Sequence, residues 1–345
     1  MKRAVLIGLG MVADTHVAAL GNAKNTKLVG VLGSSHDKTH AFAAKAANTL
    51  GHSVLAYKDL ESVAQDQCVD FVILATPPNA RTHIIDTLVA AKIPILSEKP
   101  IERTLNAALK IVETCAQARV PLGVVFQHRA REASLALKRV LDAGDLGKIA
   151  TVDLRVPWWR DQSYYDAPGR GSYDRDGGGV LINQAIHTLD LALWLLGPVA
   201  SVQALTCQTP LHRLEAEDWA SALFVMQSGA VGTLMASTAA FPGGAESITI
   251  YGTRACAHLE AGVLKITHKD GSEKTYGEVG TTGGGADPMA FTHDWHQTLI
   301  EDFATSIDER RDPMISGRDA LRAHAFITAM EDANRTGHRT EVPNT

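Results

Sequence analysis

The chain has 345 residues, of which 45% are hydrophobic and 21% are charged, and its formal net charge at pH 7 is −5. This composition is typical of folded globular proteins and excludes a mainly disordered chain. The negative charge offers no basic surface to phosphate backbones or acidic lipids, so we expect neither nucleic acid nor membrane partners and favour small metabolites. At about 150 residues per domain, the length predicts two domains.

Cysteine usage and hydropathy narrow the class of protein further. The cysteines are Cys68, Cys115, Cys207 and Cys256. They form no CxxC pair and no metal-like cluster, which is typical of reduced thiols, so we expect a cytoplasmic protein without a metal site. No segment contains the roughly 18 consecutive apolar residues that a membrane span requires.

The first third of the chain alternates apolar runs with helical patterns. Strands are predicted for residues 4–10, 27–33, 70–78 and 93–100, and helices for residues 11–23, 36–51 and 81–92. Strands this apolar, separated by helices, are typical of a parallel sheet that helices cover on both faces. The sequence therefore predicts an α/β fold that begins with a doubly wound Rossmann domain over residues 1–121.

The pattern changes after residue 121. Helices are predicted for residues 131–144, 180–197, 294–309 and 317–337, and strands for residues 150–160, 201–208, 221–237 and 246–260. Residues 161–179 and 280–288 are rich in glycine and are predicted to be loops. Strands that follow one another without intervening helices favour antiparallel pairing. We expect a second α/β domain, over residues 122–345, with a mainly antiparallel sheet.

The residues VLIGLGMVA, which begin at Val5, carry a glycine pattern between the first predicted strand and the first predicted helix. The spacing Gly8-x-Gly10-x-x-Ala13 matches the dinucleotide-binding fingerprint. Gly8 permits the tight turn, Gly10 lets the backbone approach a pyrophosphate, and Ala13 lets the helix pack closely on the strand. Because the positive end of the helix then faces the phosphates, we predict that this loop binds NAD or NADP.

The second predicted strand lacks the acidic residue that usually follows the fingerprint by about 20 residues and binds the adenosine ribose. Gly33, Ser34 and Ser35 occupy this region, and Asp37 comes several residues later. The absence of a carboxylate removes repulsion against a ribose phosphate, and the hydroxyl groups could donate hydrogen bonds to one. The pattern slightly favours NADP, and a neutral turn that accepts NAD through other contacts is the alternative.

The predicted helix VLINQAIHTLDLALWLLG begins at Val180 and is apolar on most of its surface. In a regular α-helix, Asn183, His187 and Asp190 fall on one narrow stripe. Three polar groups on an otherwise dry helix indicate either a functional site or satisfied core groups. We favour the functional interpretation because a dinucleotide fingerprint lies in the same chain.

Four segments in a fixed order carry a resemblance to a known family. They are GLGMVADTH, ATPPNARTH, the tripeptide Glu98-Lys99-Pro100, and GGGVLINQAIHTLDLALWLLG. Together they resemble the Gfo/Idh/MocA oxidoreductases over nearly the whole chain. The resemblance implies a Rossmann domain and an α/β domain with a large open sheet, which in relatives often forms dimers or tetramers. We therefore expect a homodimer or homotetramer, assembled through the C-terminal sheet, that acts on a small carbohydrate.

The resemblance also implies the residues of the site. Lys99 matches the lysine that the family places between nicotinamide and substrate, Pro100 holds the turn after it, and His187 matches the catalytic histidine. The residues that we expect to bind the cofactor are Gly8, Gly10, Met11, Val12, Ser34, Ser35, Thr76, Pro78, Asn79, His83, Glu98, Lys99 and Arg160.

The chemistry expected of such a site is hydride transfer. When NAD(P) oxidises a secondary alcohol, a hydride leaves carbon and a proton leaves oxygen. His187 suits the proton because imidazole titrates near neutral pH, and Lys99 can bind the same hydroxyl or act as the base if burial lowers its pKa. Which of the two accepts the proton stays open. We expect Asn183 to orient a substrate hydroxyl, and Asp190 to orient His187 or to bind another hydroxyl.

One departure from the family pattern bears on the substrate. Members that resemble myo-inositol dehydrogenase have Asp where this chain has Asn183. Together with the preceding YYDAPGRGSYDRDGGG, this favours the branch that oxidises nucleotide-linked hexuronic acids at the ring 3-hydroxyl, although related branches act on free sugars. Arg129, Arg160 and Arg170 are candidates to bind a substrate carboxylate or phosphate, and salt bridges are the alternative.

The predicted function is therefore NAD(P)-dependent oxidation of a secondary hydroxyl group. Two alternatives stay open: an NAD-dependent glycosidase with a transient redox cycle, and a nonenzymatic regulator that senses dinucleotides. The presence of both Lys99 and His187 argues against the regulator. His293 and His296 have no carboxylate cluster beside them in the sequence, so we interpret them as structural or close to the substrate rather than as metal ligands.

Overall fold

The computed structural model describes residues 1–279 and 292–345 and contains two compact units. The first unit consists of Met1–Glu102, Asn106–Gln127 and Thr292–Ala320, and the second of Arg103–Leu105, His128–Phe291 and Leu321–Thr345. The sequence predicted two consecutive domains that meet at residue 121. In the structure, Thr292–Ala320 also belongs to the first unit. The loop predicted for residues 280–288 lies outside the described residues.

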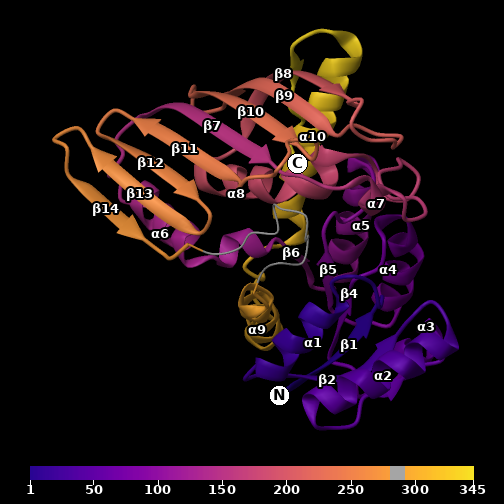
Figure 1. The fold of residues 1–345 in the computed structure, drawn as a ribbon. Helices are drawn as coiled ribbons and strands as arrows, with labels where there is room; N and C mark the ends of the chain where they lie inside the picture. Colours follow the sequence, from indigo (N-terminus) through magenta and orange to yellow (C-terminus); the bar gives the residue numbers. More distant parts are fainter. Residues whose placement is uncertain (280–291) are drawn as a thin grey trace. The chain divides into compact units, whose positions relative to one another are not determined.

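The first unit is built on a six-stranded parallel sheet in the order β3-β2-β1-β4-β5-β6 (Figure 1). Its strands are β1 (Lys2–Ile7), β2 (Thr26–Leu32), β3 (Leu55–Ala56), β4 (Phe71–Leu74), β5 (Ile95–Glu98) and β6 (Leu122–Val125). The elements between them are α1 (Ala13–Asn22), α2 (His36–Leu50), α3 (Leu60–Gln65), the 3-10 turn η1 (Pro78–Ala80), α4 (Arg81–Ala90) and α5 (Leu105–Ala118). Every residue of β4 and of β5 is buried, as in parallel strands that helices cover on both faces. The predicted doubly wound sheet is confirmed, while β3, α3, α5 and β6 were not predicted.

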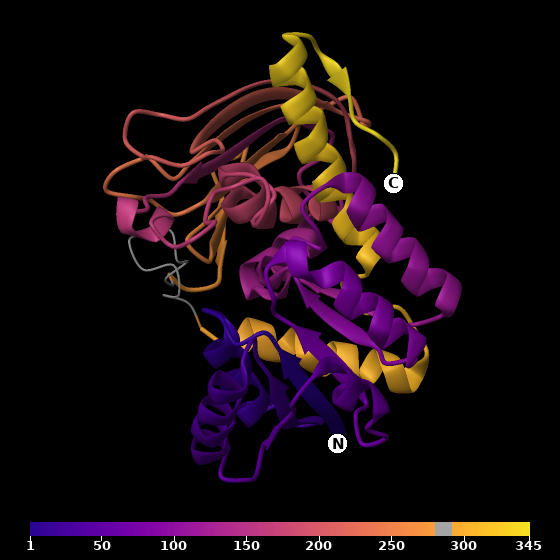
Figure 2. The same ribbon diagram turned by 90° about the vertical axis from the view of Figure 1, so that its right-hand side faces the viewer.

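Helix α9 (Asp294–Glu309) belongs to the first unit although it lies far along the chain. Figure 2 shows it in orange, and it packs beside α1. Leu299, Ile300 and Phe303 are buried on one face of α9, and the Phe303 ring lies edge-on to Phe71 of β4, with 5.4 Å between the ring centres. Burial of this apolar stripe explains why the segment returns to the first unit.

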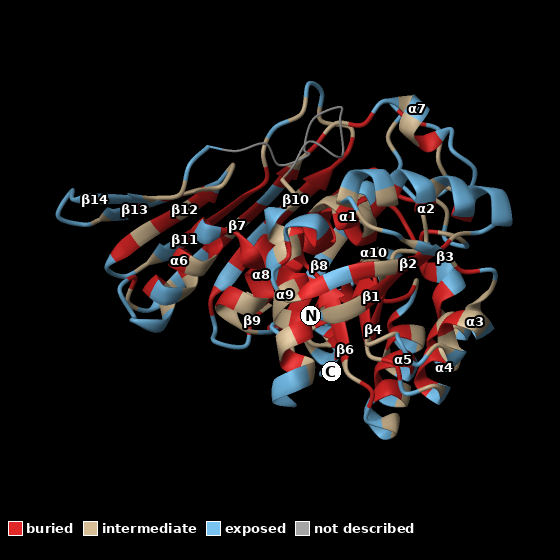
Figure 3. Ribbon diagram, turned by 90° about the horizontal axis from the view of Figure 1, so that it is seen from below, coloured by how far each residue is buried: buried red, intermediate tan, exposed pale blue. Residues whose placement is uncertain are grey.

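The second unit is built on a nine-stranded sheet in the order β14-β13-β12-β11-β7-β10-β9-β8-β15. Its strands are β7 (Ile149–Pro157), β8 (Val199–Cys207), β9 (Trp219–Met226), β10 (Val231–Ser237), β11 (Ser247–Gly252), β12 (Ala255–Glu260), β13 (Val263–His268), β14 (Glu273–Tyr276) and β15 (Thr340–Glu341). Strand β7 pairs in parallel with β10, and the other neighbouring pairs are antiparallel. The predicted large, mainly antiparallel sheet is confirmed. Figure 3 shows exposed residues along β14 and alternating burial along strands such as β10, as expected for a sheet with one covered face.

The remaining elements of the second unit include one departure from the predicted helix over residues 180–197. These elements are the 3-10 turn η2 (Gln127–Ala130), which starts at the end of the first unit, α6 (Glu132–Asp142), α7 (Gln162–Tyr165), the π turn η3 (Leu181–Ala185), α8 (Ile186–Leu196) and α10 (Gly317–Thr336), which begins in the first unit. The wider π turn separates Asn183 from α8, so the regular stripe predicted for Asn183, His187 and Asp190 was wrong at its first member. None of the helices in the described ranges combines the length and hydropathy needed to cross a bilayer.

Candidate functional site

The loop between β1 and α1 has the geometry that the dinucleotide fingerprint requires. Gly8 has a φ of +100°, and a Cβ atom placed there would lie 2.5 Å from the carbonyl carbon of Ala75, so only glycine fits the turn. A Cβ atom at Gly10 would meet nothing within 4 Å. Gly10 and Met11 are exposed and Val12 is half-buried just before α1. This open backbone at a helix N-terminus fits the pyrophosphate of NAD or NADP.

The turn after β2 presents neutral side chains where a ribose carboxylate ligand is usual. Ser34 and Ser35 are exposed, and the Ser35 hydroxyl caps α2 by accepting a hydrogen bond from the Lys38 amide at 3.4 Å. Asp37 lies in the first turn of α2, exposed beside His36, whose Nδ1 atom is 3.5 Å from its carboxylate. The Gly8 amide donates to the Leu32 carbonyl at 2.9 Å, so the end of β2 lies beside the fingerprint loop and leads into a turn of hydroxyl groups rather than a carboxylate.

The loop after β4 contains several residues that we expected to line the cofactor site. Thr76 is half-buried, Pro78 is buried at the start of η1, and Asn79 and His83 are exposed. Arg81, at the first position of α4, is 2% exposed. A cation at a helix N-terminus is unfavourable, so this arginine must be held by contacts outside its own helix.

The backbone around Lys99 is held by Arg81, a residue that the sequence analysis did not single out. The Arg81 guanidinium donates to the carbonyl oxygen of Thr76, with Nη2 at 2.6 Å, and to the carbonyl oxygens of Glu98 and Pro100. The Lys99 amide donates to the Glu98 carboxylate at 3.3 Å, and the Lys99–Pro100 peptide bond is cis. Burial lowers the pKa of Arg81 to about 10, so the guanidinium is still charged at neutral pH. These contacts fix the backbone position of Lys99, the first residue after β5.

Glu98, predicted to bind the cofactor, lies between two buried histidines of the first unit. Its Oε1 atom is 2.9 Å from His16 Nε2 and 3.7 Å from His296 Nε2. Burial raises the pKa of Glu98, but hydrogen bonds from His16 and His296 outweigh that effect and hold it well below its usual range. Burial lowers the pKa of His296. The carboxylate is therefore ionised beside two histidines, and His293, one turn earlier, contacts Asn22 instead.

These three residues, His16, Glu98 and His296, are also a group that could hold a metal ion. Their ligand atoms lie within 4.8 Å of one another. Two histidines and a carboxylate suit a divalent cation such as zinc. However, a zinc-bound imidazole keeps its proton on the other ring nitrogen, and Nδ1 of His16 is buried without a hydrogen-bond partner in the described structure. A hydrogen bond from His16 to Glu98 therefore explains the geometry better than a metal ligand does. The clustering was not visible in the sequence because each residue comes from a different element.

In the second unit, Asn183 is bound to backbone groups of the glycine-rich loop. Its side-chain amide donates to the carbonyl oxygens of Gly178 and Gly179, at 2.7 and 3.0 Å. The Glu217 carboxylate accepts the amides of Gly179 and Leu181, at 3.1 and 3.0 Å, and so caps the π turn. Asn183 therefore helps to fix this loop, which agrees with the alternative interpretation of a satisfied core group.

His187, in the first turn of α8, stacks on a second histidine of the same unit. Its ring lies 4.8 Å from the ring of His128, with 25° between the planes. His128 Nε2 is 4.0 Å from the Glu246 carboxylate, which also accepts hydrogen bonds from Arg131 at 2.5 Å and Trp158 at 3.2 Å. Glu246 is thus the anchor of a buried network that reaches His187 through His128. Lys99 and His187 belong to different units.

Asp190 is engaged in a buried ion pair. Its two oxygens accept hydrogen bonds from Nε and Nη2 of Arg129, at 2.7 and 2.6 Å. The side chains of Arg129 and Asp190 are 2% and 1% exposed, and Trp194 lies beside the guanidinium. Of the two interpretations offered for Arg129, the salt bridge is the one observed. The carboxylate of Asp190 therefore links α8 to η2 through Arg129. The helical pattern in the sequence could not identify this partner.

Arginines and aromatic rings gather around α7 in the second unit. The Arg160 guanidinium lies 5.2 Å from the Trp158 ring and 5.7 Å from the Tyr164 ring, and its Nη1 atom donates to the Trp159 carbonyl. Arg170 lies 4.8 Å from the Tyr164 ring, and its Nη1 atom is 3.8 Å from the Asp176 carboxylate. A salt bridge, the alternative offered for these arginines, is therefore observed for Arg170.

Two family models match the chain, one over its N-terminal part and the other over its C-terminal part. The model of the oxidoreductase family with an NAD-binding Rossmann fold matches residues 2–126, and the model of the GFO/IDH/MocA C-terminal domain matches residues 134–258. These matches cover the Rossmann sheet and most of the second sheet.

Several relatives of this chain are named dehydrogenases. A D-apiose dehydrogenase of Rhizobium rhizogenes is 26% identical over 306 residues, which are 83% of each chain. An inositol 2-dehydrogenase of Rhizobium meliloti is 25% identical over 94% of each chain. The crystal structure of the WlbA dehydrogenase from Bordetella pertussis, in complex with NADH and UDP-GlcNAcA, is similar with a TM-score of 0.81 and 27% identity, over 100% of this chain and 99% of that one.

Proposed function

Because the chain belongs to the Gfo/Idh/MocA oxidoreductase family, with its NAD-binding Rossmann fold, we propose that it oxidises a secondary hydroxyl group of a sugar, an inositol or a nucleotide-linked hexuronic acid. The observation that carries the proposal is the rigid backbone at Lys99, which Glu98 and Arg81 hold from two sides. A lysine whose backbone is fixed in this way can bind a substrate hydroxyl group in one defined orientation.

The residues of this chain would bind the substrate and handle its proton, while bound nicotinamide supplies the acceptor for the hydride. Gly8, Gly10, Met11 and Val12 would hold the dinucleotide in the first unit. We assign Lys99 to the hydroxyl that loses its proton, because an ammonium group stabilises the negative charge that develops on oxygen. His187 is the second candidate to take that proton.

Two roles follow for the residues around His187. His128 stacks on the His187 ring and so fixes its plane, and Glu246, 4.0 Å from His128 Nε2, holds His128 in place. Asn183 and Asp190 act in this proposal as positioning residues, since Asn183 donates to the Gly178 carbonyl oxygen and Asp190 accepts from Arg129.

Within the three substrate classes, we favour a nucleotide-linked hexuronic acid, oxidised at the ring 3-hydroxyl. The crystal structure of the WlbA dehydrogenase is a complex with UDP-GlcNAcA, a ligand that carries a carboxylate and a diphosphate. Arg160 and Arg170, stacked on aromatic rings, offer this chain donors for such groups. In this proposal Arg160 therefore binds the substrate rather than the cofactor.

For the cofactor, we favour NADP slightly over NAD. The support is the neutral turn at Ser34 and Ser35, where a carboxylate would repel a ribose phosphate. Ser35 already caps α2 through its oxygen, but its hydroxyl proton can still be donated. The crystal structure of the WlbA dehydrogenase contains NADH, so activity must be measured with both NAD and NADP.

We also propose that the chain forms a homodimer or homotetramer through its nine-stranded sheet and works in the cytoplasm. Leu205, Leu223 and Val231 are 60%, 63% and 48% exposed on three neighbouring strands of that sheet, an apolar surface that a second copy could cover. Exposed free thiols at Cys68 and Cys207 support a reducing compartment.

The test mixes the purified protein with NAD or NADP and a panel of free sugars, inositols and nucleotide-linked uronic acids. Reduced nicotinamide is followed by absorbance and released sugar by chromatography. The proposal predicts net reduction with a uronic acid and no released sugar. Released sugar without net reduction would identify the glycosidase instead, and dinucleotide binding without either product would favour the regulator.

A further inference from the structure

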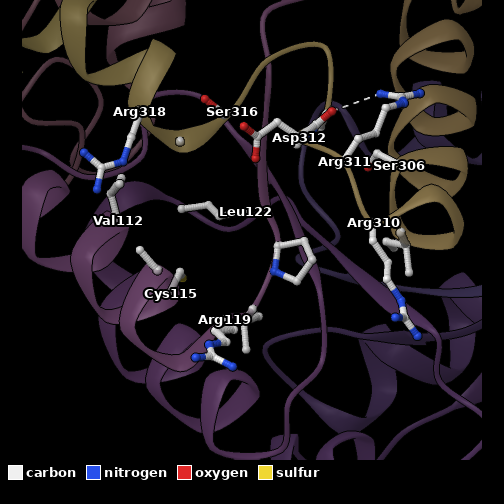
Figure 4. A pocket seen from close by; sticks show the side chains of 16 residues that line it. Val112, Cys115, Arg119, Leu122, Ser306, Arg310, Arg311, Asp312, Ser316 and Arg318 are labelled. Atoms are coloured by element: carbon white, nitrogen blue, oxygen red, sulfur yellow. Dashed lines mark hydrogen bonds between the residues drawn. The ribbon is translucent and has the colours of Figure 1, made fainter.

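The first unit contains a cavity of about 670 Å³ that the proposed function does not use (Figure 4). It is formed by the end of α5, the start of β6, the end of α9 and the segment that leads into α10. Its volume is in the range of small-molecule sites. The polar side chains on its lining include four arginines, Arg119, Arg310, Arg311 and Arg318.

The cavity lies at the opposite edge of the sheet from the cofactor loops. Leu122, at its lining, is the first residue of β6, whereas the fingerprint loop follows the carboxyl end of the parallel strand β1. The segment before α10 runs along the edge of β6, where the Val124 amide donates to the Ile315 carbonyl at 3.0 Å and Gly123 pairs with Ser316. A ligand in this cavity would therefore be separate from the dinucleotide.

Among the described residues, three of the four arginines form no ion pair. Arg311 forms ion pairs with Asp302 and Glu309, both at 2.7 Å. In the described part of the chain, the guanidinium groups of Arg119, Arg310 and Arg318 make no ion pair or hydrogen bond, and Figure 4 shows them on three sides of the hollow. Asp312 is the one acidic residue of the lining. The lining is thus strongly positive in a chain whose net charge is −5.

The backbone at two of these arginines is a second and independent observation. Arg119 and Arg310 follow the ends of α5 and α9 with φ values of +55° and +53°. They are two of the four non-glycine residues with positive φ among the described residues, the others being Lys92 and Ala261. Glycine is the favoured residue at such helix ends because other residues are strained there. Residues with strained backbone conformations occur often at functional sites, where the side chain has a specific role.

We propose that this cavity is a second small-molecule site, and that it binds an anion with two or more negative charges through phosphate groups. Guanidinium groups suit phosphate oxygens because their planar donors bind two oxygens at once. The Ser316 hydroxyl before α10 already donates to Asp319 at 2.8 Å, so the proposal depends on the arginines as donors. The inference does not depend on the substrate or the redox activity of the enzyme.

The experiment measures the binding of inorganic pyrophosphate and of a sugar bisphosphate to the full chain by calorimetry, with saturating dinucleotide present. The pocket variant is R119G/R310G/R318Q. Because glycine is favoured at both positive-φ positions, this variant is expected to unfold at a temperature no lower than the parent protein. A matched control, R139Q/R213Q/R254Q, removes three exposed arginines of the second unit.

The proposal predicts that at least one of the two anions binds, and that its affinity falls at least tenfold in the pocket variant but less than twofold in the control. Binding of pyrophosphate alone would indicate an inorganic ligand, and stronger binding of the bisphosphate a phosphorylated metabolite. The proposal is overturned if neither anion binds, if the pocket variant keeps the parent affinity, or if the control loses as much as the pocket variant. Binding that survives in the pocket variant would lie elsewhere.

Discussion

The ion pair between Arg129 and Asp190 gives the sharpest test of the structure of the second unit. In Asp190→Asn, one of two hydrogen bonds from the guanidinium, at 2.7 and 2.6 Å, would face an amide donor, and the charge of Arg129 would have no counter-charge in a site that is 2% exposed. Breaking a buried pair in this way costs about 3–5 kcal/mol. That is a large fraction of the total of about 5–15 kcal/mol that stabilises a typical protein.

The assay is urea unfolding followed by circular dichroism. The control Asp142→Asn removes an exposed pair with Lys138 and is expected to cost about 1 kcal/mol or less. The double variant Arg129→Met/Asp190→Leu is expected to recover most of the stability that Asp190→Asn loses, since no buried charge remains. The reasoning is refuted if Asp190→Asn loses no more stability than Asp142→Asn. A large rise in substrate KM with unchanged stability would instead indicate that Asp190 binds substrate.

Three further predictions follow from the first unit and from the half-buried carboxyl group of Glu331. Gly8→Ala is expected to lose at least about 2 kcal/mol of stability, because its Cβ atom would clash with backbone at 2.5 Å; urea unfolding checks this. Gly10→Ala, which has open space, is expected to fold normally but to bind dinucleotide at least tenfold more weakly, as fluorescence titration would show. Burial raises the pKa of Glu331 from 4.5 to about 7, so the folded state binds this proton more tightly and loses stability as pH rises from about 4.5 to 7. Glu331→Gln should therefore add up to about 3 kcal/mol at pH 8 and almost nothing at pH 4, compared with the exposed control Glu341→Gln; an equal gain at both pH values would contradict this.

Much of the first unit could be predicted from the sequence because its signals are local. Buried parallel strands are continuous apolar runs, and the fingerprint glycines lie within one turn of the chain. The turn at Gly8 is required by the backbone near Ala75, yet its pattern is recognisable without that partner. The same reasoning missed β3, which has two residues, because so short a strand leaves no periodicity.

The contacts that define the candidate site depend on residues far apart in sequence. Arg81 reaches the carbonyl oxygens around Lys99, and Glu98 meets one histidine from α1 and another from α9. A helical pattern places Asp190 on a face but does not identify Arg129 as its partner. The π turn at Asn183 was missed for the same reason, since a regular helix was the simplest interpretation of an apolar run.

The central claim is that Lys99 handles the hydroxyl proton during hydride transfer, and its most direct measurement is the rate of nicotinamide reduction across a pH series. The comparison uses the parent protein, Lys99→Ala and the exposed control Lys110→Ala, with the best substrate of the panel. The account predicts that Lys99→Ala lowers kcat at least a hundredfold at every pH, even at saturating dinucleotide, while Lys110→Ala keeps the parent kcat. A Lys99→Ala protein that reduces nicotinamide at the parent rate would contradict it.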